Sequence, residues 1–168
     1  MTTSLYDLTI PVFTRALNNL SAILDKGRAF ADAQGMDHAV LLEARLYADM
    51  APLTAQVQRA SDSAKGTAVR VGGVANVAME DNETSFAQLQ ARIAATIAFL
   101  ATVPRAAMDG REEVAVELVT PMGTFPFTGQ SYVLSFATPN FYFHITTAYA
   151  LLRMHGVPVG KLDYLGGV

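Results

Sequence analysis

The segment Thr138–Gly156 reads TPNFYFHITTAYALLRMHG and carries one formal charge, on Arg153. The overlapping run from Tyr132 to Leu152 is uncharged and as long as a membrane span, but the Thr138-Pro139-Asn140 sequence interrupts it and several hydroxyl side chains dilute it. We therefore predict a helix over 131–155 that is buried on nearly all sides inside a helical bundle, and no membrane association. Gly156 stands where the left-handed cap of this helix is expected.

Three further segments show the 3.6-residue periodicity of amphipathic helices. This periodicity predicts helices over 4–34, 37–65 and 84–103, each starting at a good N-cap residue. Pro11 and Pro52 lie inside the first two segments, where proline removes a backbone donor and clashes with the preceding turn. We expect Pro52 to bend the second helix, and Pro11 either to kink the first helix or to mark its true start.

The remaining segments lack helical periodicity. The run from Gly66 to Glu83 contains three glycines and no sustained period, which predicts a long irregular connection, either a linker or a lid over a binding site. Over 113–128 the period changes to two around the turn sequence Thr120-Pro121-Met122-Gly123, which predicts a β-hairpin. The expected fold class is therefore all-α: a single domain, residues 1–168, built as a four-helix bundle with a small β-hairpin inserted before the last helix.

Composition restricts the functional classes. Hydrophobic residues make up 51% of the chain and charged residues 16%, a lower charged fraction than the roughly one quarter of an average soluble domain, so we expect a homodimer that hides apolar surface. The net charge of -3 and the lack of a Lys/Arg run argue against nucleic-acid binding. The chain has no cysteine, which excludes disulfides, thiolate ligands and a cysteine nucleophile, and it begins without the features of a signal peptide. We expect a cytoplasmic protein.

His144 is the polar residue of greatest interest on the last helix. Helical spacing places it on one face with Asn140 and apolar side chains. One interpretation is a neutral core histidine satisfied by hydrogen bonds, with Asn140 one turn earlier as a candidate partner. The other is a histidine that contacts a ligand or takes part in catalysis. His155 lies eleven residues later, roughly 16 Å along the axis, so the two histidines cannot share a metal ion.

Asp49 is the second candidate, because the predicted helix over 37–65 places this carboxylate on an apolar stripe. It is either paired with Arg45 one turn earlier, or it faces His144 across the bundle, orients the imidazole and raises its pKa. Tyr142 either contributes a hydroxyl to such a site or fills space. The candidate ligand-binding residues are therefore Arg45, Asp49, Asn140, Tyr142 and His144, and catalytic residues cannot be assigned.

Three segments carry a resemblance to a known family: SLYDLTIPVFTRALNNLSAILDKG from Ser4, RLYADMAPL from Arg45, and PNFYFHITTAYALLRMHGVPVGKLDYL from Pro139. They resemble a bacterial domain-of-unknown-function family within the DinB/YfiT-like superfamily, and the similarity covers essentially the whole chain. The resemblance implies a four-helix bundle with a long crossover that is often dimeric. It implies no particular activity.

Members of this superfamily commonly bind a divalent metal through one histidine of the second helix and a His-x-x-x-His pair of the last. Here Ala148 takes the second position of that pair, and the segment after His38 that we expect to form the second helix contains no histidine. Asp49 and His144 would supply only two ligands of such a metal site. We therefore expect no metal and no other cofactor, and a bundle that binds a small ligand or a protein partner. The alternative is a metal- or thiol-dependent transferase or hydrolase with a degenerate metal site.

Overall fold

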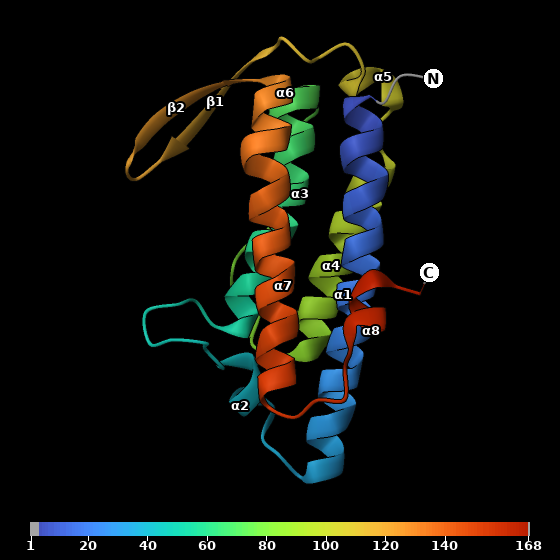
Figure 1. Cartoon of the computed structure of the whole chain (residues 1–168), viewed down its shortest axis with the longest axis vertical. Coiled ribbons are helices and arrows are strands. Elements are labelled where there is room, and N and C mark those ends of the chain that lie inside the picture. The colour runs from blue at the N-terminus through green and yellow to red at the C-terminus, as the bar shows by residue number, and fades with distance from the viewer. Residues whose placement is uncertain (1–3, 168) are drawn as a thin grey trace.

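The computed structural model of the chain describes residues 4–167. Four long helices lie side by side along its long axis (Figure 1). Helices α3 and α1 each pack against both α4 and α7, which closes the bundle around one core. The four helices are α1 (Leu5–Gln34), α3 (Leu53–Gly72), α4 (Phe86–Ala101) and α7 (Thr138–Met154). This arrangement confirms the predicted four-helix bundle.

The core follows from the apolar periodicity of the helices. Leu17, Leu20 and Leu24 of α1 are fully buried at helical spacing, and Phe13 meets Phe141 of α7 with ring centroids 4.4 Å apart. Each such side chain contributes about 2 kcal/mol by leaving water. The helix begins as predicted at the Ser4 cap, whose hydroxyl accepts a hydrogen bond from the Asp7 amide.

The predicted helix over 37–65 is wrong in its extent. Helix α2 (His38–Leu42) ends after five residues, 43–52 contains no helix, and α3 begins at Leu53. Pro52 is extended, with φ -70° and ψ 171°, and caps α3 instead of bending a continuous helix. A proline also disfavours the helical region for the residue before it, and Ala51 and Pro52 both lie outside any helix.

Helix α3 also extends further than predicted, because it continues through Gly66 to Gly72 and ends at Gly73 in the left-handed region with φ 66°. The irregular connection is therefore shorter than expected and starts after the helix. It is held against the bundle by buried cations: Lys65 Nζ donates to the Val77 carbonyl at 2.8 Å, and Arg92 Nη1 donates to the Glu80 carbonyl at 3.0 Å.

The last long helix forms as predicted but contains a wider turn. Helix α6 (Gly129–Tyr132) leads through the π-helical segment η1 (Val133–Ala137) into α7 without interruption. Pro139 follows η1, and its ring would press on the Ser135 carbonyl of a regular α-helix. A π turn moves that carbonyl and accommodates the proline without breaking the helix. The helix is followed by Gly156 with φ 88°, the predicted left-handed residue.

The β-hairpin is confirmed and projects from the bundle between α5 (Arg105–Met108) and α6 (Figure 1). Strand β1 (Ala115–Thr120) pairs antiparallel with β2 (Gly123–Thr128). A final short helix, α8 (Lys161–Leu165), packs back against α1. No helix in the described part of the chain is both long and apolar enough to cross a membrane.

Candidate functional site

Polar side chains meet along the contact between α3 and the α6–α7 helix. Because the two helices are antiparallel, residues later in α3 meet residues earlier in the partner. Three successive hydrogen bonds join the helices: His144 Nδ1 to Gln56 Oε1 at 2.8 Å, Asn140 Nδ2 to Ser63 Oγ at 2.7 Å, and Arg70 Nη1 to the Tyr132 hydroxyl at 3.1 Å. This helix pair thus has a polar seam along its contact.

The hydrogen bonds around His144 determine its tautomer. Gln56 Nε2 donates to the Ala51 carbonyl at 2.8 Å, so the amide presents its oxygen to His144 Nδ1. Nδ1 therefore carries the proton, and Nε2 has a free lone pair. Burial, and then the charge of Arg59, lower the pKa of His144 from 6.5 to about 4. The imidazole is neutral at pH 7, and Nε2 is a hydrogen-bond acceptor with no hydrogen-bond partner among the described residues.

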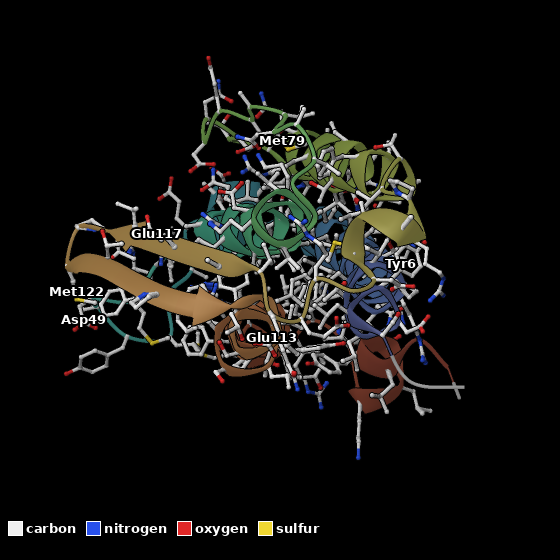
Figure 2. All side chains as sticks on the ribbon, turned by 90° about the horizontal axis from the view of Figure 1, so that it is seen from above. Tyr6, Asp49, Met79, Glu113, Glu117 and Met122 are labelled. Atoms are coloured by element: carbon white, nitrogen blue, oxygen red, sulfur yellow. The ribbon has the colours of Figure 1, made fainter. Side chains whose placement is uncertain are left out.

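A hollow of about 290 Å³, here called the α3/α7 hollow, opens beside this seam. Its walls come from α3, from the α6–α7 helix and from the hairpin: Arg59, Asp62, Ser63, Arg70, Leu118, Tyr132, Phe136, Asn140 and His144. Viewed along the bundle axis, the hairpin extends outward on the side of α3 and α7, and Met122 at its turn lies on the same side as Asp49 (Figure 2). Phe136 belongs to the π-helical segment, so the wider turn contributes directly to the wall.

The hollow has a positive balance of charge. Within residues 4–167 neither Arg59 nor Arg70 forms an ion pair with a carboxylate. Asp62 also lines the hollow, but its Oδ1 lies 2.9 Å from Arg92 Nη2 and 3.5 Å from Lys65 Nζ. The only carboxylate in the wall is therefore engaged by other cations, and both arginines remain available.

The structure brings together two of the five predicted site residues, Asn140 and His144, in one hollow. Asn140 does not bond to His144, however, because it donates to Ser63. Tyr142 faces the other side of α7, where it lines a separate hollow of about 160 Å³ with Arg15 and Tyr164.

The expectation for Asp49 is wrong, because this residue lies exposed in the 43–52 loop and not on a helical stripe. Arg45 is exposed in the same loop and donates to the Met50 carbonyl, and the described residues include no Arg45–Asp49 ion pair. Gln56 holds His144 in place of the expected carboxylate. The pKa of His144 is accordingly lowered and not raised.

Sequence reasoning missed Gln56, which holds His144, and in the wall of the hollow it missed Arg59, Arg70 and Tyr132. A signal was present in the sequence, since Gln56, Ser63 and Arg70 are polar residues spaced by seven on one face of α3. The residues of the opposite wall, from Tyr132 to His144, are spaced by four along the α6–α7 helix. The predicted helix ran through Pro52 and ended at residue 65, so this repeat along α3 was not recognised.

The profile of the family described as "Domain of unknown function (DUF1993)" matches residues 5–165. The chain belongs to the DUF1993 family. Its fold is also similar to the crystal structure of a DinB family member protein from Shewanella denitrificans, with a TM-score of 0.89 and 41% identity over 98% of this chain and 93% of that chain. No curated protein matches the chain. The DinB-like fold predicted from the resemblance is thus confirmed.

The residues of this DUF1993 chain do not fit the three-histidine metal site of the wider superfamily. His144 Nδ1 is occupied by Gln56, and the next turn of α7 presents the buried methyl group of Ala148. Among residues 4–167 no group of three or more His, Cys, Asp or Glu side chains lies close enough to hold a metal ion. At most one imidazole nitrogen of this region is free, which is too few ligands for a zinc-type site.

Proposed function

We propose that this DUF1993 protein is a binding module that takes up a small molecule in the α3/α7 hollow without a metal ion. One observation carries the proposal: a neutral imidazole, fixed by Gln56, presents an unpartnered Nε2 acceptor in a hollow that also contains two arginines free of ion pairs. Binding sites typically combine an apolar wall with a few fixed polar groups of this kind. Here Leu118 and Phe136 supply the apolar wall.

The alternative is an enzyme that uses His144 for acid–base chemistry. A catalytic acid or base works best with a pKa near the working pH, and His144 has a pKa of about 4. At neutral pH it is a weak base and cannot donate a proton from Nε2. These properties favour recognition of a ligand over proton transfer.

Nuclear magnetic resonance of the histidine ring protons tests the proposal. We expect members of a chemically diverse set of small organic compounds to shift the His144 signals of the full-length protein, and His144→Gln to abolish their binding. Tyr142→Phe is the matched control, because Tyr142 lies on the same helix but lines a different hollow. Compounds that shift no His144 signal, or that bind His144→Gln unchanged, would contradict a site in the α3/α7 hollow.

Homodimerisation and a cytoplasmic location are further parts of the proposal. Apolar side chains on the hairpin and in the 43–52 loop support a dimer, because Met122 is 87% exposed and Tyr47 is 71% exposed. The hairpin and the loop project on the same side of the bundle (Figure 1). A second copy that covers them would remove apolar surface from water.

A further inference from the structure

We infer that the ligand of the α3/α7 hollow is an elongated organic anion, and that Arg70 binds its anionic group. The inference rests on the proposed function and specifies the chemical class of the ligand. It is carried by the position of the Arg70 guanidinium, by the unneutralised charge of the hollow, and by the single acceptor that His144 offers at the other end.

Arg70 is held in place before any ligand binds. Its Nη1 donates to the Tyr132 hydroxyl at 3.1 Å, and the guanidinium carbon lies 5.9 Å from the centre of the Tyr132 ring. The side chain folds back over Gly66, where a Cβ atom would lie 2.3 Å from Nη1. Glycine inside a helix lowers its stability relative to alanine, and at Gly66 its absent side chain leaves the space that the guanidinium occupies.

A fixed guanidinium without a carboxylate partner is suited to an oxyanion, because its planar donors match the two oxygens of a carboxylate or phosphate group. The remaining donors of Arg70 have no acid partner within residues 4–167. Asp62 does not neutralise them, because Arg92 and Lys65 hold its Oδ1. The end of the hollow beside Tyr132 therefore favours a negative charge.

The opposite end of the hollow selects a different group. His144 accepts through Nε2, so the ligand must present a hydroxyl or N–H donor there. Arg59 precedes Arg70 by eleven residues, about 16 Å along the helix axis, and lines the hollow near His144. Phe136 and Leu118 contribute apolar surface to the wall. This arrangement suits an organic molecule with an anionic head, an apolar body and a donor at its far end.

Matched pairs of compounds test the charge requirement. Organic carboxylates, each paired with its own primary amide, are titrated into the full-length protein by calorimetry and followed at the His144 signals. We expect each carboxylate that shifts His144 to bind at least tenfold tighter than its amide, and to weaken as salt is added. Amides that bind the hollow as tightly as their acids would overturn the inference and leave the proposed function standing. A set in which no compound shifts His144 would overturn both.

Gly66→Ala tests the role of Arg70 without changing any charge. The added methyl group displaces the guanidinium, so we expect at least a tenfold loss of carboxylate affinity, little change for the amides, and a melting temperature no lower than that of the parent. Arg70→Gln should show the same loss. Inorganic phosphate should compete with the carboxylates in the parent and not in Arg70→Gln. Unchanged carboxylate affinity in Gly66→Ala, or competition by phosphate that survives Arg70→Gln, would overturn the assignment of Arg70.

Discussion

The His144 ring and the Gln56 side-chain amide meet between α7 and α3 at 2.8 Å, with Nδ1 donating to Oε1. The amide is itself anchored, since its nitrogen donates to the Ala51 carbonyl at the turn before α3. Gln56, in the first turn of α3, thus sets the tautomer of His144 on α7. This relationship makes His144 a neutral acceptor and leads to the first two predictions.

The stability of the protein should fall in acid because of His144. Its pKa is about 4 in the folded protein against 6.5 ordinarily, and the side chain is 7% exposed. Between these values the unfolded chain binds a proton that the folded chain does not, so the free energy of unfolding decreases as the pH falls from about 6.5 to about 4, by on the order of 3 kcal/mol. Urea unfolding at several pH values measures this.

His144→Gln is the control for the acid effect, because it removes the titrating group, and the slope over this pH range should become smaller. A ring-proton titration of His144 in the parent protein should have its midpoint near pH 4. A midpoint above pH 6 would contradict the buried, neutral histidine.

Gln56→Glu should raise the pKa of His144. A carboxylate at hydrogen-bond distance stabilises the charged imidazolium, and such a partner typically moves a pKa by 1–3 units. Ring-proton titration measures the change. Gln90→Glu is the matched control, because Gln90 bonds to Ser21 between α4 and α1 and should leave the His144 midpoint unchanged. Equal midpoints in the parent and Gln56→Glu would refute the contact.

Arg92→Met should destabilise the protein strongly. Arg92 is 4% exposed and pairs with Asp62 at 2.9 Å, Asp81 at 2.9 Å and Glu83 at 3.0 Å. Removing the cation leaves the nearly buried Glu83 without its charged partner, which costs about 3–5 kcal/mol. Chemical denaturation measures the loss, and Arg105→Met, at an exposed ion pair, should have a much smaller effect. A similar loss in the two variants would show that burial does not matter here.

Metal removal should leave the protein unchanged. The free donor atoms near His144 are too few for a transition metal, since Ala148 replaces the second histidine of the superfamily motif. Elemental analysis of protein purified without an affinity tag or chelator should find no stoichiometric zinc, nickel or iron. Dialysis against a chelator should not shift the melting temperature. A stoichiometric metal lost together with stability would contradict the prediction.

The homodimer proposal predicts the mass of the particle in solution. Sedimentation at micromolar concentration should give twice the mass of the chain. Replacing Met122 and Phe125 of the hairpin by serine should shift the equilibrium toward monomer, because both side chains are exposed and apolar. A monomeric parent protein would contradict the proposal.

The sequence by itself determined the helical bundle, the hairpin and most helix ends, because these depend on local patterns. Apolar side chains at helical spacing specify which face is buried, and the Thr120–Gly123 turn specifies the hairpin. The break at Pro52 was the principal error. The apolar pattern continues on both sides of this proline, and periodicity alone does not distinguish a kinked helix from two helices.

Only the tertiary structure decided the site. Asp49 and Gln56 are both polar residues near the second long helix, and their distance from His144 depends on where α3 begins and how it is rotated against α7. A change of one residue in register turns a helix face by about 100°, enough to replace one partner by another. The fold was therefore encoded in local periodicity, whereas the pairing of Gln56 with His144, 88 residues apart in the chain, depends on packing between helices.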